Sequence, residues 1–325
     1  MNIDQNLAEV IFESIKSAQS ILIISHRNPD ADTIGSNLTL REICKKMGKD
    51  VFSACIDPLP KNCAFLPESK NFLQTFDPEE IDLFFTVDVA SKKQAGFLEK
   101  YPELQQKKLI NIDHHPSNER YGTINFVIDD AASATLIMYN LLQVWQQKIT
   151  PTIATYLLFG LYYDTGSFMH SNTSEEVYQA AAELMNYGAN KNLITENLYK
   201  NRTLEQMHVW GKVLSDIKVT NQNIAVGGIT NQELSNRGAT LEDVSGVIDY
   251  LSMVKGSRFA TLLSEDTQGN IRGSLRTKRN DIDLSQIAGQ FGGGGHKKAS
   301  GFSLKGKIEK KSYWEIKSES KRTAL

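Results

Sequence analysis

The sequence has few cysteines and no long hydrophobic run. Its three cysteines, Cys44, Cys55 and Cys63, are odd in number and lack the C-x-x-C spacing, which argues against a disulfide framework or a zinc knuckle. The longest apolar run, residues 153–163, is too short to cross a bilayer, and the N-terminus lacks the basic and apolar regions of a signal peptide. We therefore expect a cytoplasmic protein with reduced thiols and no membrane contact.

The composition is that of an ordinary globular chain with a charge asymmetry. The 325 residues are 40 % hydrophobic and 23 % charged, and this length favours two domains. Residues 1–215 carry 19 basic and 26 acidic side chains, a balance of −7, whereas residues 216–325 carry 17 and 12, a balance of +5. An acidic half suits cations and a basic half suits an anion. The overall charge of −2 disfavours duplex DNA as a partner.

Three short apolar runs in the first half are each followed by polar residues. They are residues 21–24, 83–87 and 109–112, and they lead into Ser25-His26, Asp88 and Asp113-His114-His115. Continuous apolar character is typical of strands buried on both faces, as in a parallel sheet covered by helices. Ligands of such sheets bind outside the carboxyl ends of the strands, where all three polar clusters are expected. The predicted fold class is α/β, with helices on both faces of a parallel sheet.

Helices are expected between and after these strands, and short strands dominate the second half. Apolar spacing predicts helices over residues 32–48, 133–147 and 151–163, the last leading directly into Asp164. In the second half we expect strands over 224–229, 259–264, 271–277 and 299–304, and helices over 241–254 and 284–291. The predicted domains are residues 1–190, a helical linker over 191–215, and a smaller α/β domain over 216–325.

Eight oxygen and nitrogen donors gather in the four polar clusters of the first half: His26, Asp30, Asp32, Asp88, Asp113, His114, His115 and Asp164. Brought together without basic neighbours, they would repel one another unless cations were bound. This many donors suits two metal ions sharing an aspartate, and the mixture of carboxylate and imidazole favours Mn²⁺, with Mg²⁺, Co²⁺ or Fe²⁺ as alternatives. Paired metals promote in-line displacement at phosphorus, so the pattern indicates hydrolysis of a phosphoester or phosphoanhydride by an activated water.

A run of four glycines in the second half has two interpretations. Gly292–Gly295 followed by His296 is typical of a flexible hinge, but it also lets backbone N–H groups approach an anion closely. Arg258, Arg272 and Arg276 come from strands expected nearby, and arginine is suited to bidentate phosphate contacts. Together with the basic balance, they favour an anion-binding face.

The motifs resemble, in order and spacing, those of a known superfamily. Residues 26–36 (His-Arg-Asn-Pro-Asp-Ala-Asp-Thr-Ile-Gly-Ser), the isolated Asp88, Asp113-His114-His115 and Asp164-Thr165-Gly166 resemble the four motifs of the DHH phosphoesterases. The glycine run with His296, followed by Ala299-Ser300-Gly301, is similar to the signature of the DHHA1 substrate domain. The resemblance covers nearly the whole chain. It is strongest to short members of the superfamily that lack additional domains.

This resemblance implies a role for each matched residue. One metal would be held by His26, Asp30 and Asp88, and the other by Asp32, Asp88, His114 and Asp164, with Asp88 bridging. Asp113 would support the site and His115 would lie close to the scissile phosphate. The substrate's terminal phosphate would be held by Arg276, Arg258, Gly293, Gly294, Gly295 and His296. Thr33 and His170 depart from the residue types expected at their positions.

The expected function is hydrolysis of very short RNA to mononucleotides and of 3′-phosphoadenosine 5′-phosphate to AMP and phosphate. The modest positive balance of the second half suits a small anion or about two to five nucleotides of single-stranded RNA. An alternative is a phosphodiesterase for cyclic dinucleotides or their linear products. A binding module without catalysis is disfavoured because every expected ligand is present. The sequence leaves the oligomeric state, monomer or homodimer, open.

Overall fold

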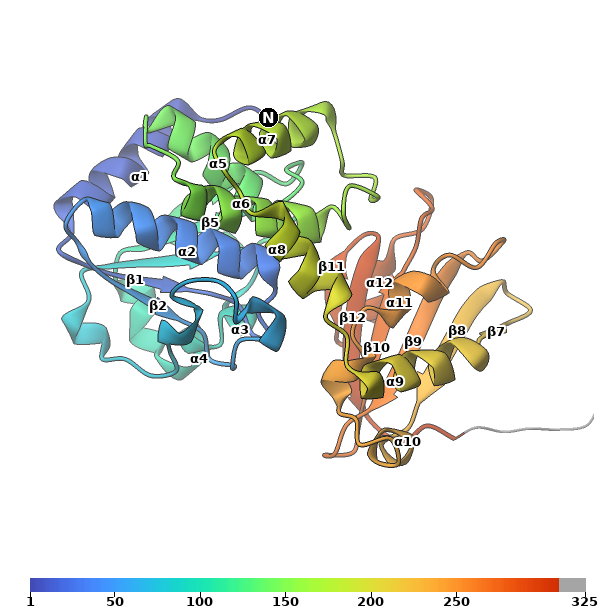
Figure 1. Ribbon diagram of the computed structural model, residues 1–325. Coiled ribbons are helices and arrows are strands. Elements are labelled where there is room, and N and C mark those ends of the chain that lie inside the picture. Colours follow the sequence, from blue (N-terminus) through green and yellow to red (C-terminus); the bar gives the residue numbers. More distant parts are fainter. Residues whose placement is uncertain (310–325) are drawn as a thin grey trace, which may run out of the picture. The chain divides into compact units, whose positions relative to one another are not determined.

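The structure is a computed structural model that describes residues 1–309, and it divides into two compact units. The first unit is Met1–Arg202 and the second begins at Thr203, so the division falls within the linker expected at residues 191–215. Each unit has its own six-stranded sheet (Figure 1). The assignment of residues 1–190 and 216–325 to a metal-binding and a substrate domain stays a prediction.

The sheet of the first unit is entirely parallel, and this confirms the fold class expected from the sequence. Its strand order is β3-β2-β1-β4-β5-β6. The strands are β1 (Ser20–Ile24), β2 (Asp50–Ala54), β3 (Phe72–Leu73), β4 (Leu83–Val87), β5 (Leu109–Asp113) and β6 (Ile124–Val127). The three strands with continuous apolar character, β1, β4 and β5, form the centre of the sheet. Sequence analysis did not identify the strands outside this centre, which are partly exposed.

Helices cover both faces of this sheet (Figure 1). They are α1 (Gln5–Ser17), α2 (Ala31–Lys46), α3 (Lys92–Ala95), α4 (Phe97–Lys100), α5 (Ala134–Val144), α6 (Pro151–Asp164), α7 (Glu175–Asn186) and α8 (Lys191–Thr195). The larger core contains α1, α2, α5, α6 and α7 on one face, where Ile23 and Phe85 point. The smaller core contains α3 and α4 on the other face, where Leu22 and Phe84 point. Successive side chains of these strands therefore point to opposite faces of the sheet and are buried on both. This explains why the strands are continuously apolar.

The strand order reverses direction between β1 and β4. From β1 the chain adds β2 and β3 on one side, and then β4, β5 and β6 follow on the other. Ligands of open α/β sheets bind outside the carboxyl ends of the strands at such a switch point. His26 follows β1 and Asp88 follows β4, so both lie at this position.

The second unit is a mixed sheet with short helices. Its strand order is β11-β12-β10-β9-β8-β7, in which only the β8–β9 pair is parallel. Its strands are β7 (Lys218–Val219), β8 (Ile224–Ile229), β9 (Phe259–Glu265), β10 (Asn270–Arg276), β11 (Gly294–His296) and β12 (Ala299–Lys305). Its helices are α9 (Leu204–Ser215), α10 (Asn231–Ser235), α11 (Val247–Leu251) and α12 (Leu284–Gly289). Within residues 1–309, no helix has the length and apolar character needed to cross a membrane.

One expectation for the second unit was wrong, and one of the two interpretations of the glycine run fails. The single helix expected over residues 241–254 is a 3₁₀ turn (Leu241–Val244) followed by α11, because Gly246 between them has a left-handed φ of 88°. The hinge interpretation of the glycine run also fails, since Gly294–His296 pair with β12 as a strand. A Cβ atom on Gly293 would lie 2.1 Å from the Gly301 carbonyl oxygen, and one on Gly295 would lie 2.6 Å from the Ala299 carbonyl oxygen, so these two positions require glycine because two backbones pack closely there.

We predict that Gly35→Ala destabilises the first unit. A Cβ atom at Gly35 on α2 would lie 2.4 Å from the carbonyl oxygen of Tyr156 on α6, so the two helices must separate. Overpacking of this kind costs about 1–3 kcal/mol, which urea denaturation would measure. Gly211→Ala is the matched control, because Gly211 is also helical but has open space around it. The control gains helix propensity and should be neutral or slightly stabilising. Equal stability of both variants would contradict the close approach of α2 and α6.

Candidate metal centre

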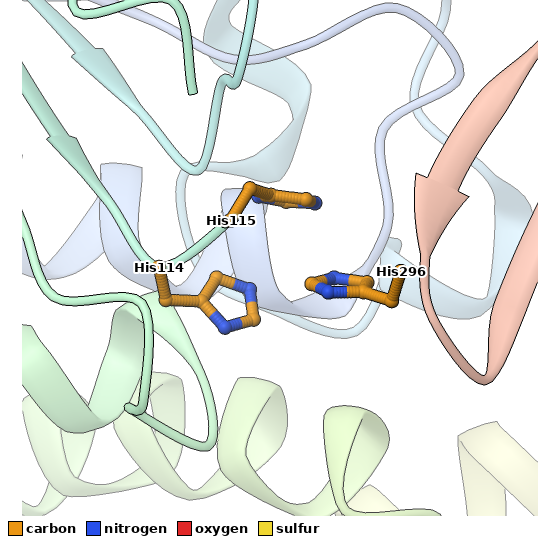
Figure 2. Close-up of side chains that lie close together, drawn as sticks. All are labelled: His114, His115 and His296. Carbon is orange, nitrogen blue, oxygen red and sulfur yellow. The ribbon is translucent and has the colours of Figure 1, made fainter. Parts of the chain in front are cut away.

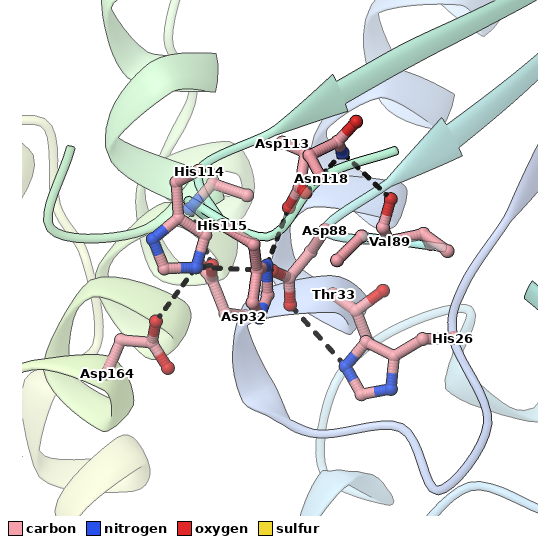
Figure 3. Close-up of polar contacts among 12 residues, drawn as sticks. His26, Asp32, Thr33, Asp88, Val89, Asp113, His114, His115, Asn118 and Asp164 are labelled. Atoms are coloured by element: carbon pink, nitrogen blue, oxygen red, sulfur yellow. Dashed lines mark hydrogen bonds and ion pairs between the residues drawn. The ribbon is translucent and has the colours of Figure 1, made fainter. Parts of the chain in front are cut away.

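The carboxyl edge of the first sheet brings together residues from five segments. His26 lies in the loop after β1, Asp88 directly follows β4, and Asp113 ends β5 and is followed by His114 and His115. Asp30 is the N-cap of α2 and Asp32 lies in its first turn, whereas Asp164 is the last residue of α6. All eight donors expected from the sequence therefore meet at one edge, and Figure 3 labels all of them except Asp30.

Three groups of donors share this edge: His26, Asp30 and Asp88; Asp32, His114 and Asp164; and Asp88, Asp113 and His115. Within each group the donor atoms lie within 4.8 Å of one another. The first two groups have no residue in common, whereas the third shares Asp88 with the first. In the first, His26 Nε2 lies 3.7 Å from Asp30 Oδ1. In the second, His114 Nε2 lies 3.3 Å from Asp164 Oδ2 and 3.8 Å from Asp32 Oδ2. These compact sets have the composition of sites for hard or borderline cations.

Asp88 lies between the first two groups. Its Oδ2 is 3.5 Å from His26 Nε2, and its Oδ1 is 3.3 Å from His114 Nε2. The side chain is 3 % exposed, and Oδ1 is buried without a hydrogen-bond partner among the described residues. Besides His114 Nε2, His115 Nδ1 lies 3.5 Å from Oδ1, but neither contact has hydrogen-bond geometry. A buried carboxylate oxygen without a hydrogen bond is costly unless a cation completes its environment. The two oxygens thus face different donor groups, which is the arrangement of a bridging ligand.

Backbone carbonyls orient the imidazoles of His26 and His114. Nδ1 of His26 lies 2.8 Å from the carbonyl oxygen of Arg27, and Nδ1 of His114 lies 3.2 Å from that of Ala131. Because a carbonyl only accepts, each Nδ1 is the donating nitrogen and Nε2 faces the carboxylates. Histidines that bind metals commonly donate their other N–H in this way. The structure therefore fits divalent cations on the basis of its hydrogen bonds as well as its residue types.

Asp32 is completely buried and is held by the N-terminus of α5. Its Oδ2 accepts a hydrogen bond from the Ala134 N–H at 2.6 Å, and its Oδ1 accepts from the N–H and hydroxyl of Thr135 at 2.9 and 2.6 Å. The positive end of a helix stabilises a carboxylate there. Gly160 on α6 permits this packing, since a Cβ atom on it would lie 2.6 Å from Asp32 Oδ1.

The crowding of charge shifts the pKa values of the cluster. Burial and the nearby Asp88 carboxylate raise the pKa of Asp32 to about 7, and burial together with Asp32 also raises the pKa of Asp164. Burial opposes the charged forms of His26 and His114, but contacts with the aspartates outweigh it and raise both pKa values. The pKa of Asp88 is lowered, because its contacts with His114 and His26 outweigh burial. Without metal the cluster is therefore rich in protons near neutral pH.

His115 is oriented by a second carboxylate. Its Nδ1 lies 2.8 Å from Asp113 Oδ1, and Asp113 Oδ2 accepts a hydrogen bond of 2.5 Å from the Asn118 side chain. The rings of His114 and His115 stand edge to face after β5, with their centres 4.7 Å apart (Figure 2). Because the Asp113 carboxylate accepts from Nδ1, the nitrogen of His115 that can exchange a proton is Nε2.

Several residues that form hydrogen bonds with the cluster were not predicted from the sequence. Thr135 could have been found, since a helix was expected to begin at Ser133 and helix N-termini attract carboxylates. Asn118 and its partner Asn111, a polar residue within buried β5, gave no comparable signal. His170 belongs to the turn after Asp164, where its Nδ1 lies 3.1 Å from the Asp164 carbonyl oxygen and its ring covers Gly166.

The residues expected to bind substrate lie in the second unit. Ala299 on β12 pairs with both His296 on β11 and Arg276 on β10, and residues directly opposite one another share a face of the sheet. Arg276 and His296 therefore flank a small alanine on the same face. Arg276 also lines a pocket of about 200 Å³ with Arg258 and Lys278, and its Nε lies 3.3 Å from Asp249 Oδ1.

Comparisons with known proteins agree with the resemblance noted in the motifs. Residues 20–161 match the model of the DHH family, N-terminal domain, and residues 221–316 match the DHHA1 domain. The chain is 30 % identical to the bifunctional oligoribonuclease and PAP phosphatase NrnA of Thermus thermophilus, over 91 % of this chain and 88 % of that protein. It is 28 % identical to the NrnA of Bacillus subtilis, over 90 % and 92 %.

A solved structure is also similar along most of the chain. An exopolyphosphatase-related protein from Bacteroides fragilis matches with a TM-score of 0.86 and 26 % identity, over 94 % of this chain and 93 % of that one. Together with the two matching domain models, these relatives establish the family. The chain therefore belongs to the DHH family of phosphoesterases and carries a DHHA1 domain in its second half.

Proposed function

We propose that this phosphoesterase uses two divalent cations, most suitably Mn²⁺, to hydrolyse very short oligoribonucleotides and 3′-phosphoadenosine 5′-phosphate. Two relatives with about 90 % coverage are named as oligoribonucleases and PAP phosphatases, which supports this substrate class. The observation that carries the proposal is the position of Asp88, whose two oxygens face two separate donor groups. A single metal ion would need only one of the two donor groups, the one around His26 or the one around His114.

The donor set fits two metals of the manganese class. One would be held by His26, Asp30 and Asp88, and the other by Asp32, Asp88, His114 and Asp164. Carboxylate and imidazole without thiolate suit Mn²⁺, Mg²⁺, Co²⁺ or Fe²⁺. Paired cations at such a site acidify an attacking water and neutralise charge developing on phosphoryl oxygens.

The chain itself supplies orientation and proton handling. Asp113 accepts from Nδ1 of His115, which fixes the orientation of the ring. We assign His115 Nε2 to proton transfer with the leaving oxygen, a role that imidazole serves near neutral pH. Asn118 holds Asp113 in place from the other side. Asp113 is thus a positioning residue rather than a ligand in this proposal.

The second unit would hold the terminal phosphate of the substrate. Arg276 and His296 flank Ala299 on one face, so a phosphate above Ala299 lies within reach of both side chains. Gly293, Gly294 and Gly295, which lead into His296, would offer backbone N–H groups to the phosphate, and Arg258 lines the same pocket as Arg276. Binding a substrate by its end would restrict the enzyme to short substrates.

A product assay with purified protein and Mn²⁺ tests this proposal. It would compare 3′-phosphoadenosine 5′-phosphate, a 5′-phosphorylated diribonucleotide, a cyclic dinucleotide, pyrophosphate and a long RNA, with a chelator as control. We expect phosphate from the first and mononucleotides from the second, with poor turnover of the others. Preference for the cyclic dinucleotide would instead assign the enzyme to cyclic dinucleotide turnover, and no turnover of any substrate would refute the catalytic proposal.

We predict that replacing Asp88 removes both metal binding and activity. Asp88→Ala and Asp88→Asn both lose the bridging charge, and Asn additionally tolerates the left-handed φ of 59° at this position. Activity should fall by more than the roughly 100-fold that loss of an outer-shell partner costs. Asp50→Asn, at an exposed carboxylate on β2, is the control. Full activity in a folded Asp88→Asn protein would refute the two-metal site.

We predict that Arg276→Ala and His296→Ala raise KM chiefly for substrates that carry a terminal phosphate. The loss of a charge-assisted phosphate contact costs about 1.5–3 kcal/mol, or roughly 10- to 100-fold in KM. Lys218→Ala is the control, because Lys218 is an exposed cation on β7, at the edge of the same sheet opposite to β11. Equal increases in KM for substrates with and without the phosphate would rule out a phosphate clamp.

We predict that the metal-free protein loses stability as pH rises from about 6 to 8. The pKa values of Asp32, Asp164, His26 and His114 are all raised, so the folded state binds more protons than the unfolded chain in this range. Stability therefore falls as these protons leave. Mn²⁺ should reverse the trend by replacing the protons. Calorimetry after EDTA dialysis would show a Tm that falls with pH, and the same pH slope with and without Mn²⁺ would contradict the explanation.

A further inference from the structure

A single hydrogen bond links the segments that carry Asp32 and Asp88. Thr33, on α2, is completely buried, and its hydroxyl donates to the carbonyl oxygen of Val87 at 2.8 Å. Thr33 directly follows Asp32 in the sequence, and Val87 directly precedes Asp88. The backbone N–H of Thr33 also donates to Asp30 Oδ1 at 3.3 Å. Thr33 is thus hydrogen-bonded to Asp30 and to the residue that precedes Asp88, and it is the sequence neighbour of Asp32.

The backbone conformation at Asp88 requires contacts that hold it in place. Asp88 has a left-handed φ of 59°, which costs free energy in a residue with a side chain and persists only where its surroundings impose it. On one side, the Asp88 N–H donates to the Ile112 carbonyl of β5 at 2.9 Å. On the other side, the pairing of β4 with β1 ends at Thr86 and Ile24, one residue before Val87. The Thr33 hydroxyl holds the Val87–Asp88 peptide just beyond this last pair.

We propose that Thr33 is a positioning residue for the bridging carboxylate. Its hydroxyl fixes the Val87–Asp88 peptide against α2, so that Asp88 Oδ2 faces His26 and Oδ1 faces His114. This inference rests on the metal centre proposed above. It assigns to Thr33 no contact with metal or substrate, and its effect passes entirely through Asp88.

A second threonine on the same helix provides a matched control. Thr39 is also completely buried on α2, but its hydroxyl has no hydrogen-bond partner among residues 1–309. Thr33→Val and Thr39→Val are the same chemical change in the same helix, and only the first removes a hydrogen bond. Thr33→Ser retains the hydroxyl and tests for rescue.

The test is a titration of EDTA-dialysed protein with Mn²⁺. Calorimetry measures the heat of binding, and electron paramagnetic resonance measures the Mn²⁺ that stays free. Loss of an outer-shell partner typically weakens metal binding about 10- to 100-fold, and we expect this for Thr33→Val. Thr39→Val and Thr33→Ser should bind Mn²⁺ within about 3-fold of the unaltered protein, because the first removes no hydrogen bond and the second retains the hydroxyl. If Thr33→Val does not fold, Thr33→Ala, which has higher helix propensity and also lacks the hydroxyl, replaces it.

Two results would overturn the inference: unchanged Mn²⁺ affinity in the folded Thr33 variant, or an equal loss in Thr39→Val. Asp88→Asn, titrated in parallel, separates this failure from failure of the metal centre. If Asp88→Asn loses Mn²⁺ but Thr33→Val does not, only the role of Thr33 is wrong. If neither variant loses Mn²⁺, the proposed metal centre itself is wrong.

Discussion

The mutual repulsion of four aspartates at one edge of a parallel sheet is the constraint on which this site depends. Asp30, Asp32, Asp88 and Asp164 converge with two imidazoles, and Asp32 and Asp88 have almost no contact with solvent. In a buried environment such a cluster is unfavourable unless protons or cations neutralise it. Burial and mutual repulsion raise the pKa values of Asp32 and Asp164, which favours the protonated carboxyl groups in the absence of metal. Divalent cations would replace these protons, and this exchange links metal binding, stability and pH.

The N-termini of two helices partly compensate for the negative charge of these aspartates. Asp30 caps α2 by accepting from the N–H groups of Asp32 and Thr33, and Asp32 accepts from the first turn of α5. Both carboxylates therefore occupy helix N-termini, where the partial positive charge stabilises them. The close approach of helices at Gly35 and Gly160 permits this packing. Packing of α2 against α6 and α5 is consequently a requirement of the site as well as of the core.

The central strands and the donor residues could be predicted from the sequence because one physical pattern marks both. A strand buried on both faces is continuously apolar, so the polar residues that follow β1, β4 and β5 stand out. The partly exposed β2 and β6 lack this contrast and were missed. The break at Gly246 and the strand at Gly294–His296 depend on tertiary packing, which overrides local preference. Asn118 and the Thr33 hydroxyl were also hidden, because their importance lies in contacts with residues distant in the sequence or on another element.

The central claim is that Asp88 lies between two cations. The most direct measurement is the number and position of Mn²⁺ ions bound by the full chain, from elemental analysis after gel filtration and anomalous X-ray diffraction at the manganese edge. The account predicts two ions per chain, one beside His26 and the other beside His114, with a different oxygen of Asp88 bound to each. A single ion, or two ions that do not share Asp88, would contradict it.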